Sequence, residues 1–417
     1  MIPRWSWILA QLNRRIWVRA TLFSLLAVAA ALLGIAVSPY IPADLPTKIG
    51  AEAVDHILGI IASSMLTVTT FSLSVMVSAY SAATSNVTPR ATRLVMEDST
   101  TQNALSTFIG SFLFSLVGII VLSTGAYGAQ GRVVLFGATI VVLILIVATL
   151  LRWIDHLSRL GRVTETTALV EAAAEKAIRD RHKYPFMGGT HLDETSNIPA
   201  LARPIHIETI GYVQHVDMQA LSTLIGEKSA AIYLIAIPGN FVDPTEPIAW
   251  CVGLDDDPEP AIRECYTIGE TRAFDQDPRF GVSVLAEIGS KALSPAINDP
   301  GTAIDVVGRA VRLLAIWAEP VEVTEPIHPR VFVPELDLSD IFDDIFTPIA
   351  RDGAGIIEVG LRLQAAFATL SRMEPERFGS PTKRHAEEAL RRSEKLLVAF
   401  DYERLVAASE FSLMVRG

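Results

Sequence analysis

The chain has 417 residues, of which 50% are hydrophobic and only 19% charged, and its mean hydropathy is +0.37. This composition is too apolar for an average soluble enzyme. The net charge is −11, and no run of Lys or Arg lies outside the flanks of the apolar stretches. That argues against a nucleic-acid partner, because phosphate binding needs clustered positive charge.

Residues 1–19 carry apolar residues at helical spacing together with tryptophans and arginines. This pattern predicts an interfacial amphipathic helix that leads into a membrane; a disordered basic leader is the alternative. A cleaved signal peptide fits poorly, because its basic region would be unusually long and its removal would leave three spans.

Four stretches without a charged residue follow, at 20–43, 57–89, 99–131 and 133–151. A helix needs roughly 20 apolar residues to cross a bilayer, so residues 20–151 are predicted to form a domain of four transmembrane helices. The two longest stretches exceed one crossing, and their ends are expected to project into water or to bend.

Basic residues near the span ends predict the orientation. One side carries Arg4, Arg14, Arg15, Arg19, Arg90, Arg93, Arg152, Arg159 and Arg162, and the other carries Lys48 and Arg132. This bias predicts a multi-pass protein of a bacterial cytoplasmic (inner) membrane with both termini in the cytoplasm.

The second stretch contains an unusual number of hydroxyl side chains, in "SSMLTVTTFSLSVMVSAYSAATS" at 63–85. At 100° per residue, seven of them fall within an arc of about 80°. We call these seven residues the hydroxyl stripe: Ser63, Thr67, Thr70, Ser74, Ser78, Ser81 and Ser85. The opposite arc is apolar and holds Met65, Val68, Val75, Met76, Ala79 and Ala83.

Two interpretations of the hydroxyl stripe remain open. Small hydroxyl residues help helices to pack, and they bond their own i−4 carbonyls or a neighbouring helix. They also line pores, because hydroxyls replace water of hydration without adding charge. The stripe covers the full membrane depth, which favours a path. One helix cannot form a pore, so a path implies a homo-oligomer or a bundle.

The remainder of the chain is predicted to be a cytoplasmic α+β region. A connecting helix is expected at 152–182, and β-branched and aromatic residues predict a small β domain at 203–254. The strand, glycine turn and strand at 232–250 resemble a barrel-sandwich hybrid of the lipoyl/biotinyl type. The modifiable lysine of those carriers is missing.

Two matched segments at 258–318 predict a helical hairpin. Asp277 with Pro278, and Asp299 with Pro300, each read as an N-cap followed by proline at the first helical position. Asn298 precedes the second cap. Helix N-termini also bind anions, but here the capping carboxylates already occupy the amides.

Residues 327–417 predict an α/β segment and a charged C-terminal helical region suited to contacts between protomers. Asp337, Asp340, Asp343 and Asp344 could bind a divalent cation, but their spacing is not that of a calcium loop, so a solvated helix face is the preferred interpretation.

Four segments together resemble a known family: "FSLSVMVSAYSAATSNVTPR", "PGNFV", "DPRFG" and "ALSPAINDPGTA". The chain is similar over nearly its whole length to the predicted bacterial membrane proteins of domain of unknown function 2254. The resemblance implies a four-span inner-membrane protein with a soluble C-terminal half, and it brings no catalytic residues.

No phosphate loop, zinc-spaced histidine pair or nucleophile elbow is found, and the histidines, such as His156, stand apart in the sequence. Cys251 and Cys265 make neither a disulfide framework nor a metal cluster. We therefore expect no enzyme activity, cofactor or metal. The leading hypothesis is a homo-oligomeric channel for small ions or solutes, lined by the stripe and gated or assembled by the cytoplasmic region. The alternative is a membrane-anchored sensor or scaffold without transport.

Overall fold

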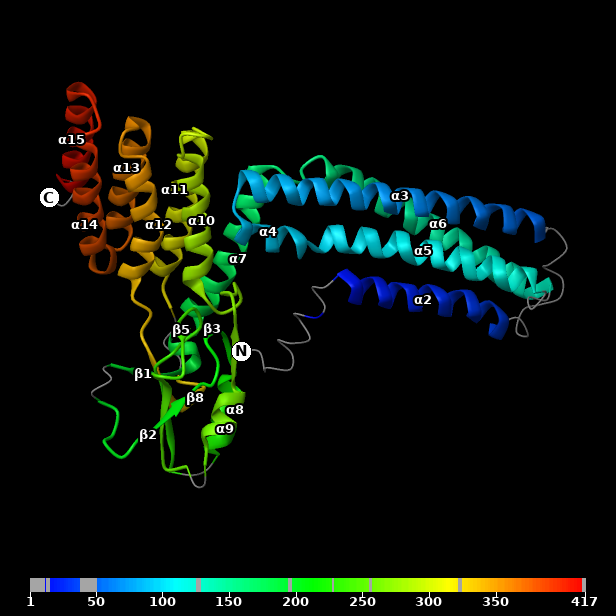
Figure 1. Cartoon of the computed structure of the whole chain (residues 1–417), viewed down its shortest axis with the longest axis horizontal. Helices are drawn as coiled ribbons and strands as arrows, with labels where there is room; N and C mark the ends of the chain where they lie inside the picture. The colour runs from blue at the N-terminus through cyan, green and yellow to red at the C-terminus, as the bar shows by residue number, and fades with distance from the viewer. Residues whose placement is uncertain are drawn as a thin grey trace. The chain divides into compact units, whose positions relative to one another are not determined.

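Figure 1 shows the computed structural model of the chain. The structure describes residues 12, 16–37, 51–124, 129–193, 197–226, 229–254, 257–321 and 325–414. Most of the expected interfacial helix at 1–19 lies outside these residues. The chain divides into two compact units, Ile8–Glu165 and a second that contains Thr166–Gly417, and each is considered by itself.

The first unit is a bundle of helices. Its helices are α2 (Ile16–Val37), α3 (Ala51–Asn86), α4 (Pro89–Met96), α5 (Ser99–Ser123) and α6 (Ala129–Leu157). Helix α5 lies against α2, α3 and α6. Glycine permits this close approach: a Cβ atom at Gly110 would lie 3.3 Å from the carbonyl oxygen of Phe23, and one at Gly118 would lie 3.0 Å from Leu58 Cδ1.

Buried apolar side chains hold the bundle together in two clusters. One contains Leu58, Phe114 and Leu135, and the other contains Phe108 and Trp153. In water, burial of each such side chain would stabilise the fold by roughly 1.5–3 kcal/mol. Inside lipid, van der Waals packing between the helices stabilises the bundle instead.

Three of the helices are long and apolar enough to cross a membrane: Ala53–Ser85, Ser99–Ser123 and Gly131–Leu157. These three candidate membrane helices coincide with three of the expected spans. In α2 the apolar stretch among the described residues is shorter, Trp17–Leu32. Residues 38–43 of the expected first span lie outside the described residues, so the fourth span stays a prediction.

The second unit contains two sheets. Its strands are β1 (Gly189–Leu192), β2 (Arg203–His206), β3 (Gly211–Val216), β4 (Ala231–Leu234), β5 (Phe241–Val242), β6 (Pro247–Val252), β7 (Tyr266–Gly269) and β8 (His328–Pro334). One sheet has the order β1-β8-β4-β6-β2 and the other β5-β3-β7. Strand β8 pairs in parallel with both β1 and β4, so the larger sheet is mixed.

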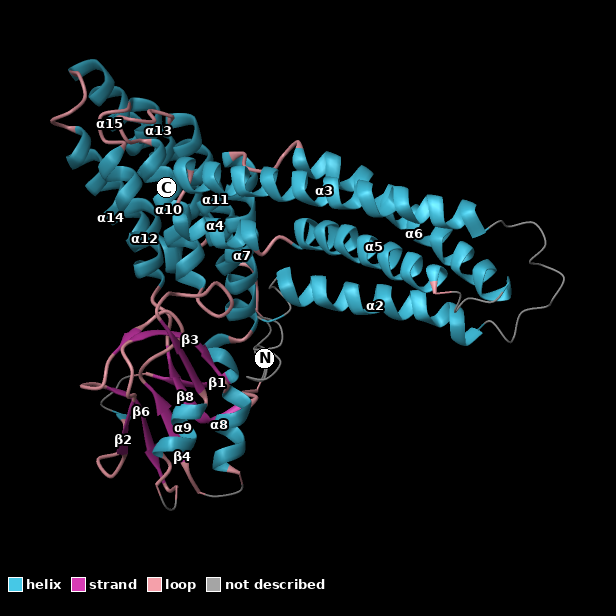
Figure 2. Cartoon of the chain, turned by 45° about the vertical axis from the view of Figure 1, so that its right-hand side comes forward, coloured by secondary structure: helices cyan, strands magenta, loops and turns pink. Residues whose placement is uncertain are grey.

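Helices make up the rest of the second unit. They are α7 (Val163–Lys183, which begins in the first unit), α8 (Met218–Ile225), α9 (Glu259–Glu264), α10 (Pro278–Ala292), α11 (Pro300–Ala315), α12 (Leu338–Asp352), α13 (Ile357–Met373), α14 (Pro375–Ser393) and α15 (Ala399–Met414). Short 3-10 segments occur at Pro185–Gly188 and Ile316–Ala318. Helices α8 and α9 lie with the strands, and α10 to α15 form a separate helical layer (Figure 2).

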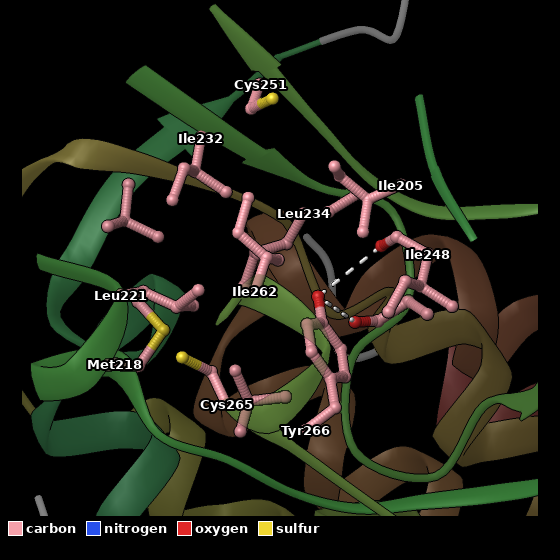
Figure 3. Packing of buried hydrophobic residues seen from close by; sticks show 14 of the residues in the cluster. Ile205, Met218, Leu221, Ile232, Leu234, Ile248, Cys251, Ile262, Cys265 and Tyr266 are labelled. Atoms are coloured by element: carbon pink, nitrogen blue, oxygen red, sulfur yellow. Dashed lines mark hydrogen bonds between the residues drawn. The ribbon is translucent and has the colours of Figure 1, made fainter. Parts of the chain in front are cut away.

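The β part has its own apolar core (Figure 3). In it the Tyr266 hydroxyl lies 3.4 Å from the carbonyl oxygens of both Ala236 and Ile248, and Cys251 and Cys265 are buried, free thiols. The strands around 232–250 form an antiparallel pair, Ile232 opposite Cys251. The described strands do not confirm the barrel-sandwich hybrid, because this pair continues into a mixed sheet through β8.

Candidate functional site

All seven residues of the hydroxyl stripe lie on α3 and are exposed in the protomer. The opposite arc faces the bundle: Met65, Met76, Ala79 and Ala83 are buried there. The stripe therefore occupies the outward face of a helix that is long and apolar enough to span a membrane. The described residues of the protomer leave this polar surface uncovered.

Most stripe hydroxyls donate a hydrogen bond back to their own helix. Thr67 Oγ1 donates to the Ser63 carbonyl at 3.0 Å, and Ser74 Oγ donates to the Thr70 carbonyl at 3.1 Å. Ser63, Thr70, Ser78 and Ser85 make similar bonds to carbonyls three or four residues earlier. With the hydrogen committed to the helix, each oxygen keeps lone pairs free to accept from water or to approach a cation.

Apolar side chains flank the stripe on both sides. Ile60 and Phe71 lie toward one side of its arc, and Leu66, Leu73 and Val77 toward the other, at 100° per residue. All five are exposed. The outward face of α3 is thus a polar track between two apolar borders. A ring of protomers that met along the borders would enclose the track.

Another face of α3 is fixed by a buried hydrogen bond. Trp153 Nε1 on α6 donates to Ser72 Oγ at 2.9 Å, and both side chains are buried. Ser72 is only two residues from Ser74, yet it lies outside the stripe. The bond ties the rotation of α3 to the bundle and so sets which residues face outward.

A polar cluster joins α5 to the end of α6. Asp98 Oδ2 caps α5 by accepting from the Thr101 amide at 2.7 Å, and it lies 3.0 Å from His156 Nε2. Burial alone would raise the pKa of Asp98, but the hydrogen bonds from His156 and Thr101 outweigh it and lower the pKa to about 2. His156, which stands apart in the sequence, therefore has an acidic partner that only the fold reveals.

The hairpin caps of the second unit are located where the sequence places them. Asp277 accepts from the amides of Arg279 and Phe280 at 3.1 Å, with Pro278 at the first helical turn. Asp299 accepts from the Thr302 amide at 3.1 Å and is followed by Pro300. Asn298 adopts the left-handed conformation, with φ of 51°, which lets the chain turn between α10 and α11.

Asp277 also has a partner that sequence reasoning missed. Arg272 donates to both of its carboxylate oxygens, at 2.7 and 2.9 Å, and Asp277 is only 2% exposed. Burial raises the pKa of Asp277. Gly239 packs directly on this carboxylate: its φ is 102°, and a Cβ atom would lie 2.6 Å from Asp277 Oδ2. The segments "PGNFV" and "DPRFG" thus meet at one buried ion pair.

The four aspartates of the helical region are occupied by other partners. Asp337 caps α12 through the Ser339 amide at 2.8 Å. Asp340 and Asp344 form ion pairs with Arg279, and Asp343 lies 2.8 Å from Arg384 Nη2. Among the described residues no group of three or more His, Cys, Asp or Glu side chains is arranged to hold a metal ion.

Comparison with known proteins finds mycobacterial relatives and one matching family model. It is 25% identical over 261 residues to an uncharacterized protein of Mycobacterium tuberculosis and, equally, to one of Mycobacterium bovis. The matches cover 60% of this chain and 50% of each relative, so the chain spans about half the length of these curated relatives. No solved structure matches significantly. Residues 13–369 match the family described as "Predicted membrane protein (DUF2254)", and the chain belongs to this family.

Proposed function

We propose that the protein is the protomer of a homo-oligomeric passive channel whose path is lined by the hydroxyl stripe of α3. The observation that supports this most is the exposure of all seven stripe residues on the outward face of a membrane-spanning helix. A helix in lipid that merely packs against its neighbours has no need of a polar face over its whole length.

The assembly follows from the geometry of that face. One helix contributes only one wall of a path, so several copies must bring their stripes together, and homo-oligomers usually close as symmetric rings. The exposed apolar residues beside the stripe, such as Phe71 and Val77, are then the contacts between neighbouring protomers. This arrangement turns hydroxyl oxygens toward the axis and apolar side chains toward protein or lipid.

The chemistry of the stripe fits passive conduction. Its hydroxyls carry no charge, and their oxygens present lone pairs because their hydrogens are bonded to backbone carbonyls. Ion-coupled pumps usually place carboxylates or lysines inside the membrane. The apolar segments 99–123 and 133–151 contain none. We propose no enzymatic step and no cofactor.

The proposed topology completes the four-span arrangement. Helix α2 is the fourth span, and Arg19 Nη1 donates to Asn103 Oδ1 at 3.0 Å, so the N-terminal ends of α2 and α5 lie together. His156 near the end of α6 meets Asp98 at the start of α5. Basic residues Arg19, Arg90 and Arg159 therefore lie toward one end of the bundle. We assign that end of the bundle to the cytoplasmic side of a bacterial inner membrane, together with both termini. The second unit then lies in the cytoplasm, where it serves as a gating and assembly domain.

A second function is favoured by one observation. Because the stripe hydroxyls are satisfied within their own helix, the face can contact lipid or a partner helix without water. The protein would then be a membrane-anchored sensor or scaffold that acts through its second unit and transports nothing.

Recording from the purified full chain in planar bilayers separates the two functions. The channel predicts unitary currents that fall at least tenfold in Thr70→Leu, which adds bulk and removes the hydroxyl. Val141→Leu adds one carbon atom at an exposed position of α6, away from the stripe and its borders, and is the matched control, expected to leave conductance within twofold. Absence of currents from protein that is a monomer in mild detergent would support the scaffold instead.

A further inference from the structure

The second unit contains a cavity of about 1270 Å³. Small-molecule sites typically occupy roughly 300–1,000 Å³, so the space is ample for one ligand. Its walls come from the end of α7, the edge strand β1, the segment after α11, the loop before α12 and the start of α14. These segments are distant in sequence, and the cavity has no part in the proposed path.

A buried guanidinium lines this cavity. Arg181, in the last turn of α7, is 8% exposed, and its Nη2 lies 3.5 Å from the Gln276 carbonyl oxygen, a long hydrogen bond. Burial lowers the pKa of Arg181 to about 10, so it stays cationic at neutral pH. The charge of Asp277 acts to raise the pKa of Arg181, but this carboxylate is already held by Arg272 through two short hydrogen bonds.

The next residue adds a polar atom without a hydrogen-bond partner among the described residues. His182 also lines the cavity, and its Nε2 is buried with no hydrogen-bond partner among the described residues. A buried charge that no carboxylate pairs with and a buried ring nitrogen without a hydrogen bond both cost free energy. A ligand carboxylate would satisfy both, because it pairs with a guanidinium in two parallel hydrogen bonds and accepts from an imidazole N–H.

The remaining walls are acidic and apolar. Glu325, Glu374 and Glu376 line the cavity, and within the described chain none of them forms an ion pair with a basic side chain. Tyr184 and Phe186 contribute aromatic surface. Phe186 is held there in a left-handed turn, φ 54°, with its ring 4.4 Å from that of His191.

These walls narrow the class of ligand. Six carboxylates and two arginines line the cavity, so a dianion such as phosphate meets net repulsion. A simple amine would leave Arg181 without its anion. We propose that the cavity binds a small zwitterion of the amino-acid class with an apolar side chain: its carboxylate contacts Arg181 and His182, its ammonium group contacts the glutamates, and its side chain packs on the aromatic rings.

Isothermal titration of the purified full chain tests the charge pattern directly. The probes are L-phenylalanine, 3-phenylpropionate, which lacks the ammonium group, 2-phenylethylamine, which lacks the carboxylate, and inorganic phosphate. We expect L-phenylalanine to bind saturably and at least tenfold more tightly than either half-molecule. Binding of a half-molecule or of phosphate as tight as that of L-phenylalanine, or no binding of L-phenylalanine, would overturn the proposal.

Variants then assign each end of the ligand. Arg181→Gln should weaken L-phenylalanine at least tenfold and leave 2-phenylethylamine within twofold, which also shows that the cavity is intact. If Arg181→Gln does not fold, the double variant Glu374→Gln, Glu376→Gln should weaken L-phenylalanine and spare 3-phenylpropionate. Glu387→Gln, on α14 but outside the cavity, is the control. Wild-type affinity for L-phenylalanine in Arg181→Gln or in the double variant would contradict the assignment.

Discussion

Helices α3 and α5 of the same bundle are both rich in hydroxyl side chains, yet they place them on opposite kinds of surface. On α5, Thr101, Ser106, Thr107, Ser111 and Ser115 are buried between neighbouring helices. On α3, the stripe is exposed in the protomer. The comparison teaches that hydroxyl content does not by itself distinguish packing from conduction; the face that carries it does.

The buried hydroxyls of α5 are explained by size. The Oγ atoms of Ser106 and Ser115 have no hydrogen-bond partner among the described residues, so hydrogen bonding is not what holds them there. They accompany Gly110 and Gly118, where α2 and α3 approach α5 closely. Small residues at these positions allow helix contact. Among the described residues, no helix packs in this way against the stripe on α3.

The largest expected effect comes from adding bulk to each face. Ser115→Leu on α5 should lower the free energy of unfolding by about 3 kcal/mol, because the side chain has no space between helices. Ser74→Leu on α3 makes the same chemical change on an exposed face and should stay within about 0.5 kcal/mol. Thermal and denaturant unfolding in mild detergent measures both, and equal losses would remove the distinction between the helices.

The next effect compares two serines on α3 itself. Ser72→Ala leaves the buried Trp153 Nε1–H without its acceptor and should cost about 2 kcal/mol. Ser74→Ala removes a hydroxyl that bonds only its own helix and should cost a few tenths of a kcal/mol. The same unfolding measurement applies. A larger loss in Ser74→Ala would mean that the outward face is not the one described.

A smaller effect depends on pH. Asp98 has an ordinary pKa of 3.8 when unfolded and about 2 when folded, so it stabilises the folded state above pH 3.8. That contribution is lost as the pH falls from about 4 toward 2. Asp98→Asn keeps an N-cap side chain but removes the carboxylate charge, so it should cost about 1 kcal/mol at neutral pH and should flatten this part of the pH profile.

The exposed Asp155, paired with Arg159 at 3.0 Å, provides the control for Asp98. Asp155→Asn should change stability by less than about 0.5 kcal/mol, because exposed ion pairs contribute little. If the stability of Asp98→Asn fell between pH 4 and pH 2 as that of the wild type does, the contact between α5 and α6 would not depend on this carboxylate.

Features that depend only on residues close together in the sequence could be predicted. Helical periodicity identifies the stripe from the sequence alone, and the Asp-Pro pairs identify the starts of α10 and α11. Hydropathy identified three of the spans. That the stripe lines a path stays a prediction, since exposure of a face does not say what covers it.

Long-range contacts could not be predicted in this way. Nothing near His328 in the sequence indicates that β8 joins β1 and β4 in parallel, so the barrel-sandwich expectation rested on one strand pair alone. The partners Arg272 for Asp277 and His156 for Asp98 are likewise set by the fold. A single sequence carries only a weak signal for such pairs. The signal is an isolated charged residue in a segment expected to be buried, which requires a partner.

Thiol accessibility along α3 tests the central claim most directly. Single cysteines at Thr67, Thr70 and Ser74 sample the stripe, and cysteines at Leu66, Phe71 and Leu73 sample the equally exposed borders. The native Cys251 and Cys265 are buried, which limits the background. A water-filled path predicts that a charged, membrane-impermeant reagent modifies the three stripe positions in the assembled protein and spares the three border positions. Equal protection of both sets would contradict the path and leave a lipid- or protein-covered face.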